Sequence, residues 1–111
     1  MAVTYGILYQ GQLATTDTAL YSPTSGATLI DQVTVCNTTG SAETLDLSLV
    51  DGGGSMAESN QLYDAFSVGA NSTVVLSGLI NHRMETADQI RALASANTSL
   101  TLTISGREGV T

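Results

Sequence analysis

Hydrophobic and polar residues alternate most strictly between residues 29 and 50, LIDQVTVCNTTGSAETLDLSLV. A first apolar row, at Val33 and Val35, alternates with polar residues. After turn formers at 37–41, a second row follows as Leu-Asp-Leu-Ser-Leu at 45–49. Alternation with a period of two places one face of a strand in a core and the other in water, and the turn residues let the chain reverse. The stretch therefore predicts two strands joined by a turn, with an apolar face that a second layer must cover.

Further apolar segments, separated by turn signals, supply that second layer. They predict short strands at residues 3–9, 18–21, 61–68, 74–79, 90–96 and 100–104. Short strands with turn signals at regular spacing are typical of a β-sandwich or a β-barrel. We therefore expect an all-β fold, a single-domain antiparallel β-sandwich over residues 1–111. It would be immunoglobulin-like or jelly-roll-like, with about eight short strands.

Two of the segments also have helical propensity. Residues 56–63 are expected to form one helical turn at most. Residues 85–96 are interpreted as strand, because their apolar residues alternate with Arg91 and Ser95 and continue the pattern of the neighbouring segments.

The alternation also predicts which side chains are buried. Within the strand at 45–49, Leu47 is expected to point inward and Ser48 outward. Replacing Leu47 with alanine should then cost about 2–5 kcal/mol, whereas a replacement of Ser48 should stay within about 0.5 kcal/mol. The expected core consists of Val33, Val35, Leu45, Leu47, Leu49, Leu76, Leu100, Leu102 and Ile104.

The charge distribution excludes one class of partner. The net charge is −7, there is no lysine, and Arg83, Arg91 and Arg107 are scattered. A protein that binds nucleic acid needs clustered positive charge, so we expect no nucleic-acid partner. Anionic membrane surfaces are disfavoured for the same reason, and no segment is long enough for a membrane helix. The N-terminal sequence lacks the pattern of a signal peptide, so we expect synthesis in a cytoplasm.

Charged residues make up only 12% of the chain, about half the usual share. Threonine, serine, glycine and alanine fill the predicted outer faces instead. This composition favours a surface that neighbouring subunits cover in part, although Thr-rich sheets also occur on monomers.

No pattern of reactive residues predicts catalysis. Cys36 is the only cysteine and is interpreted as a small buried apolar residue beside Val35. A catalytic thiol would need a base close by, and nothing in the sequence places the only histidine, His82, near Cys36. The glycines at 52–54 lack the lysine and the hydroxyl residue of a phosphate loop. We expect no catalytic residue and no cofactor.

The acidic residues are expected to lie in solvent. Asp51, Glu58 and Asp64 do not have the spacing of a calcium loop, so no metal site is expected. Asp46 and Asp64 would suit glycoside hydrolysis only if they flanked a groove. The aromatic residues are interpreted as core and interface packing, with a sugar-binding surface as the alternative. They are Tyr5, Tyr9, Tyr21, Tyr63 and Phe66.

The N-terminal segment differs from the other predicted strands because it is apolar on both faces. Tyr5, Ile7 and Tyr9 lie on one side and Leu8 on the other. One face can pack on the chain's own core, and the other then needs a partner. We therefore predict that Tyr5, Ile7, Leu8 and Tyr9 contact a neighbouring subunit or another protein of the same assembly, with residues 1–15 as a possible inter-subunit strand or arm. An ordinary edge strand within the domain is the alternative.

Several short motifs occur in an order that resembles a known family. VCN is followed by TTGSA and then by LDLSLVDGG, and next come NQLYDAFSVGANSTVVLSGL, IRALASA and LTLTISG. Together they resemble the small all-β virion structural proteins of tailed bacteriophages, over roughly residues 20–106. The turns at 22–26 and 86–88 depart from the family pattern, which puts the site of attachment in doubt but not the fold.

The resemblance implies a function without catalysis. Its members are compact β-sandwiches on the phage particle, usually in symmetric copies. By this resemblance the chain would be a capsid decoration or cement subunit that binds other virion proteins, the major capsid protein in this position, as a homo-oligomer located on the virion. A neck or tail accessory subunit, which would bind neck or tail proteins, is one alternative. A carbohydrate-binding or adhesion module that engages the host surface is another.

Overall fold

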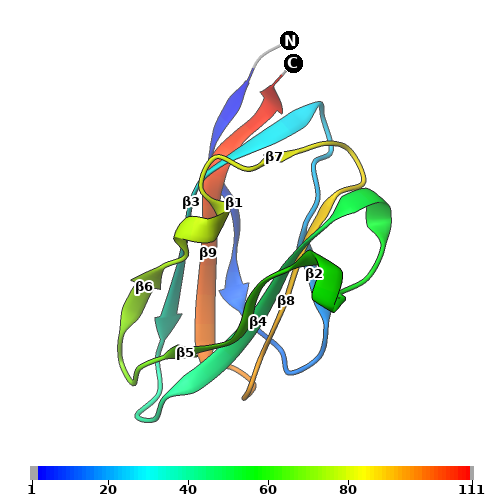
Figure 1. The fold of residues 1–111 in the computed structure, drawn as a ribbon. Coiled ribbons are helices and arrows are strands. Elements are labelled where there is room, and N and C mark those ends of the chain that lie inside the picture. The colour runs from blue at the N-terminus through cyan, green and yellow to red at the C-terminus, as the bar shows by residue number, and fades with distance from the viewer. Residues whose placement is uncertain (1–2, 111) are drawn as a thin grey trace.

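The computed structural model describes residues 3–110, which form two antiparallel β-sheets that face each other (Figure 1). Sheet A has the strand order β1-β9-β3-β6, with β7 also paired to β3, and sheet B has the order β2-β8-β4-β5. The expected all-β sandwich is confirmed. The strands are β1 (Thr4–Gln12), β2 (Thr18–Tyr21), β3 (Ala27–Asn37), β4 (Glu43–Val50), β5 (Gln61–Val68), β6 (Thr73–Val75), β7 (Arg83–Met84), β8 (Gln89–Ala94) and β9 (Leu100–Val110). Three single-turn 3₁₀ helices connect them, η1 (Asp51–Gly53), η2 (Glu58–Asn60) and η3 (Ser77–Leu79).

The strands pair as one long hairpin that is wrapped around the core. Starting from its closed end, β4 pairs with β5, β3 with β6 and β7, β2 with β8, and β1 with β9. Successive pairs belong alternately to sheet B and sheet A. This nesting is the strand order of a jelly roll, and it distinguishes the fold from the immunoglobulin arrangement that the sequence had left open.

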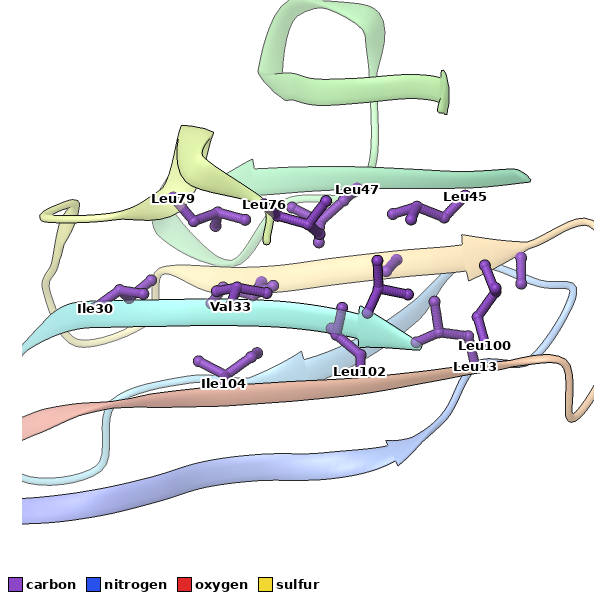
Figure 2. Close-up of a cluster of buried hydrophobic side chains, with 14 of the residues drawn as sticks. Leu13, Ile30, Val33, Leu45, Leu47, Leu76, Leu79, Leu100, Leu102 and Ile104 are labelled. Atoms are coloured by element: carbon purple, nitrogen blue, oxygen red, sulfur yellow. The ribbon is translucent and has the colours of Figure 1, made fainter. Parts of the chain in front are cut away.

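The core lies between the two sheets, where the inward rows of both meet (Figure 2). Figure 2 shows Leu45 and Leu47 from β4 facing Val33 of β3 and Leu102 and Ile104 of β9. The expected core residues are all buried except Leu49, which is half-buried and packs against the core. The inward rows also contain Ile90, Ala92 and Ala94, which alternation marks equally well. Ile30 is buried too, although it is out of phase with Val33 and Val35, because the register of β3 with β9 shifts between Ile30 and Gln32.

The apolar segment at 74–79 is only partly the expected strand. β6 ends at Val75, and η3 follows from Ser77 to Leu79. Leu76 and Leu79 are both fully buried. In a 3₁₀ turn, residues three apart lie one above the other, so the turn buries two leucines where a strand would bury alternate residues.

The two segments with helical propensity form the structures that were expected of them. Residues 85–96 contain β8, as predicted, and residues 56–63 contain the single turn η2. The Asn60 side chain closes this turn, because its Oδ1 accepts the Ala57 N–H at 3.0 Å and its Nδ2 donates to the Ser55 carbonyl at 3.0 Å.

The expectation that Ser48 is exposed was wrong. Ser48 lies opposite Arg91 of β8 on the outward row, as alternation predicts, but it is fully buried. Other groups lie close to this part of β4, because η2 contacts the strand and Arg91 pairs with Asp17, whose Oδ2 also accepts the Met56 N–H at 3.4 Å. Among the described residues, the Ser48 hydroxyl has no hydrogen-bond partner.

We expect Ser48→Ala to raise the free energy of unfolding by about 1 kcal/mol, because a buried hydroxyl without a partner is desolvated without compensation. Urea denaturation would measure the change. Leu47→Ala is the matched control, and we expect it to lower stability by about 2–5 kcal/mol. A clear loss of stability in Ser48→Ala would mean that the hydroxyl makes a bond that the fold needs.

Candidate functional site

The residues with chemical reactivity do not converge on one place. Across residues 3–110 there is no pocket and no group of three or more His, Cys, Asp or Glu side chains placed to hold a metal ion. No helix in this range has the length and apolarity that a membrane span requires. The search for a site therefore turns to hydrogen-bonded clusters and to exposed apolar surface.

Cys36 and His82 lie far apart. The His82 carbonyl accepts the Ile30 N–H at 3.0 Å, and Cys36 follows Ile30 by six residues along β3, about 20 Å at the rise of a strand. The expectation that Cys36 is buried was wrong. Cys36 stands on the outward row of sheet A, between Thr73 and Thr101, and is half-buried. Its neighbour Val35 occupies the inward position.

The acidic residues that were considered for catalysis have structural roles or lie in solvent. Asp46 Oδ1 accepts the Ala65 N–H at 2.7 Å and so holds a bulge in β5, where Ala65 has a φ of 48°. Asp64 is exposed beside this bulge. A half-buried carboxylate that accepts a backbone N–H is the ordinary support of an irregular strand.

Asp88 organises the glycine-rich loop after β4. Its Oδ1 accepts the Gly52 N–H at 2.9 Å, and its Oδ2 accepts the Glu85 N–H at 2.8 Å. Burial raises the pKa of Asp88, but these two bonds outweigh it and hold the pKa below its usual value. The loop is therefore closed by a carboxylate of the chain itself, which fits its interpretation as a connection.

A second cluster joins the two sheets at Tyr21. The Tyr21 hydroxyl bonds to Thr28 Oγ1 at 2.6 Å and donates to Glu108 Oε1. Glu108 Oε2 accepts the Thr24 hydroxyl at 2.7 Å. Hydrogen bonds from Tyr21 and Thr24 lower the pKa of Glu108, whereas burial and the Glu108 carboxylate raise the pKa of Tyr21 to about 12. Every group in the cluster has a partner, so it acts as a joint between β2 and sheet A.

This joint predicts a loss of stability in alkali. A tyrosine whose pKa is raised in the folded state contributes stability that is complete below pH 10, the unfolded value, and declines as the pH approaches about 12. We expect the melting temperature to fall across this window and the fall to be smaller in Tyr21→Phe. Tyr5→Phe, which alters an exposed phenol, is the control and should behave as the original chain. An equal fall in Tyr21→Phe would contradict this role.

Most of the aromatic residues belong to the core. Tyr63 and Phe66 pack edge to face with ring centroids 5.1 Å apart, and the Tyr63 hydroxyl accepts the Gly78 N–H at 2.9 Å. This contact closes the side of the sandwich between β5 and η3. Tyr9 and Tyr21 also pack against the core, which leaves Tyr5 as the one strongly exposed ring. Within residues 3–110, the aromatic rings therefore do not gather on one exposed surface.

The two most exposed large apolar side chains of the described residues lie on β1, where the exposed fraction is 72% for Tyr5 and 63% for Ile7. The other exposed apolar residues are scattered and less exposed, with Val75 of β6 next at 48%. In the described part of the chain, β1 pairs with β9 along one side, and no strand pairs with its other side. β1 is the blue strand in Figure 1. Its backbone groups and its apolar side chains are the candidate site.

A β-bulge divides the predicted interface residues into two pairs. The register with β9 shifts between Ile7 and Tyr9, so that Ile7 lies opposite Ser105 whereas Tyr9 lies opposite the buried Ile104. Tyr5 and Ile7 therefore point outward, and Leu8 and Tyr9 pack against the core. The sequence pattern had placed Tyr9 beside Tyr5 because unbroken alternation does not include a bulge. An association through Tyr5 and Ile7 stays a prediction.

Gly106 lies beside this bulge, opposite Gly6 of β1. A Cβ atom at this position would stand 2.4 Å from the Leu29 carbonyl oxygen and 3.2 Å from Leu8 Cδ1. The register of β3 with β9 also shifts beside Gly106, between Ile30 and Gln32. One glycine thus accommodates the close approach of two neighbouring strands.

We expect Gly106→Ala to destabilise the fold by more than an ordinary surface change, on the order of 2 kcal/mol or more, because a backbone oxygen would have to move. Chemical denaturation would measure it. Gly40→Ala is the control, since nothing lies within 4 Å of a Cβ at Gly40. Equal stability of the two variants would show that β3 can shift freely at this point.

The other strand edges of the molecule are better protected than β1. β2 has four residues, and the far edge of sheet A is divided between β6 and β7, with three and two residues. β5 has eight, but it contains the bulge at Ala65 and the charge of Asp64. β1 has nine residues and no charged side chain. Short length, charge and bulges keep edges from pairing with other chains, and β1 has only its single bulge.

No protein-family model matches the chain, and the comparisons with curated proteins and with solved structures find no match.

The free edge of β1 can add a strand from another chain. Backbone N–H and C=O groups on an unpaired edge supply hydrogen bonds to an incoming strand, and exposed side chains supply specificity. At β1 those side chains are Tyr5 and Ile7, an aromatic and a branched aliphatic group of the kind that anchors protein interfaces.

Proposed function

We propose that this chain is a non-enzymatic structural subunit that assembles into a virion of a tailed bacteriophage through the free edge of β1. The observation that carries the proposal is the exposure of Tyr5 and Ile7 on a long, uncharged edge strand. Exposed apolar groups on an unpaired edge favour addition to another chain. The assignment to a phage particle is supported by the order of the sequence motifs, which resembles that of small virion proteins of tailed phages.

The jelly-roll fold is compatible with this role. It occurs in viral capsid domains and also in lectins, so the fold by itself does not decide the function. The surface favours the structural role over sugar binding, because a sugar-binding surface usually presents several rings and Tyr5 is the single strongly exposed ring among the described residues. A decoration or cement position on the capsid is the preferred location, with the neck or tail as the alternative.

We expect Tyr5→Glu and Ile7→Lys each to reduce incorporation of the subunit into particles by about tenfold or more, because central anchors dominate interface energies. Quantitative mass spectrometry of purified particles would measure the number of subunits per particle. Val75→Lys is the matched control, since Val75 is an exposed aliphatic residue on β6. Circular dichroism of the isolated variants would show that they are folded.

Point substitutions test this edge better than removal of the strand. Deleting residues 1–10 would remove Leu8 and Tyr9 from the core and much of the pairing partner of β9. Normal incorporation of both edge variants would place the contact surface elsewhere. In the unmodified particle, hundreds of copies would indicate a capsid position, and a small number set by a ring would indicate the neck or tail.

A further inference from the structure

The charges are divided unequally between the two sheets. Three of the ten acidic side chains pair with the three arginines. Of the other seven, only Glu108 lies in sheet A, where it bonds to Tyr21 and Thr24. The remaining six lie in sheet B or in the segments that lead into its strands: Glu43, Asp46, Asp51, Glu58, Asp64 and Asp88.

The strands of sheet A are electrically balanced. They contain two arginines and two carboxylates, which are Arg83, Arg107, Asp31 and Glu108. Arg107 and Asp31 form an ion pair at 2.6 Å on this sheet. β1 itself contains no charged residue, and neither does β2, the strand of sheet B that lies nearest to it. β1 and β2 are therefore two uncharged strands side by side in a strongly acidic molecule, and the nearby carboxylates of Asp17 and Glu108 are held by Arg91 and by Tyr21.

This division decides which edge two copies of the chain can share. Pairing through β5 would bring Asp64 and the neighbouring Asp46 of both copies together, and like charges opposite each other are unfavourable. Pairing through β1 brings no charges together, and it leaves the acidic strands β4 and β5 on the far sides of both copies. Two copies of an uncharged, apolar edge can therefore pair without electrostatic repulsion between them.

We propose that the occupant of the β1 edge is a second copy of this chain, paired antiparallel through β1 across a two-fold axis. The proposal rests on the proposed function, because it names the partner of the same edge. An antiparallel pair of identical strands has its two-fold axis perpendicular to the sheet. Both copies of sheet A then join into one continuous sheet. The two copies of sheet B lie on the same side of it, with their acidic strands β4 and β5 away from the axis.

The side chains of β1 select a register for this pair. With Gly6 on the axis, Tyr5 of each copy lies opposite Ile7 of the other, on the same outward face. Aromatic and β-branched residues are favourable cross-strand neighbours. Gly6 leaves the axis free, since nothing lies within 4 Å of its Cβ position and its φ of 149° suits glycine. The same pair of contacts therefore forms twice.

Sedimentation equilibrium of the isolated full chain tests the pair. We expect a dimer whose dissociation constant rises about tenfold or more in Tyr5→Glu and in Ile7→Lys, because each change removes two symmetry-related contacts. The double variant Tyr5→Glu/Ile7→Lys should recover much of the loss, since the new carboxylate of each copy faces the new ammonium of the other. Val75→Lys should leave the dissociation constant unchanged.

The outcomes separate this inference from the proposed function. An isolated chain that stays monomeric, or a dimer that the edge variants do not weaken, overturns the two-fold pair. Failure of the double variant to recover association also overturns it. If the single variants nevertheless lose incorporation into particles, the edge takes a strand of a different virion protein and the proposed function stands. If they are incorporated normally, the proposed function fails as well.

Discussion

The pairing of β3 with β9 is the interaction on which the rest of the structure depends. Both strands have eleven residues, and they pair along nearly their whole lengths in the middle of sheet A. Their inward rows supply Val33, Val35 and Ile104 to the core. Because β9 is the last strand and lies in the centre, it offers its second side to β1. The first strand thereby becomes an edge, and this gives the chain its candidate surface.

Gly106 links this central pair to the candidate surface. The close approach of β3 and β9 at Gly106 leaves no room for a side chain, and Leu8 of β1 packs over the same position. The bulge that accommodates Leu8 also turns Tyr9 inward and leaves Tyr5 and Ile7 outside. A packing requirement in the middle of the sheet therefore decides which residues are available at its edge.

A tyrosine closes each of the two open sides of the sandwich, one by a bond to a backbone N–H and the other by a bond to a carboxylate. Tyr63 reaches from β5 to the backbone of η3 at Gly78. Tyr21 reaches from β2 to Glu108 of β9, through a hydrogen bond that raises its own pKa and lowers that of the carboxylate. A phenol combines an apolar ring with a polar tip, so it can leave one sheet and end on a polar group of the other. Two of the four tyrosines, Tyr21 and Tyr63, therefore have structural roles between the sheets.

The amino-acid sequence by itself determined the strands and most of the core. Alternation is a local property: it assigns Val33, Leu47 and Leu102 to the apolar face of their strands whichever strands they pair with, and all three are buried. Only the tertiary structure decided the jelly-roll order, because pairing partners such as β1 and β9 lie about a hundred residues apart and local patterns do not encode them. The sequence pattern placed Tyr5 and Ile7 on one face of β1, and both are exposed, whereas it did not show the inward turn of Tyr9 or the burial of Ser48. A bulge in the pairing with β9 turns Tyr9 inward, and Ser48 is buried although it lies on the outward row of β4. In both cases a residue's exposure depends on what chain folding places over it.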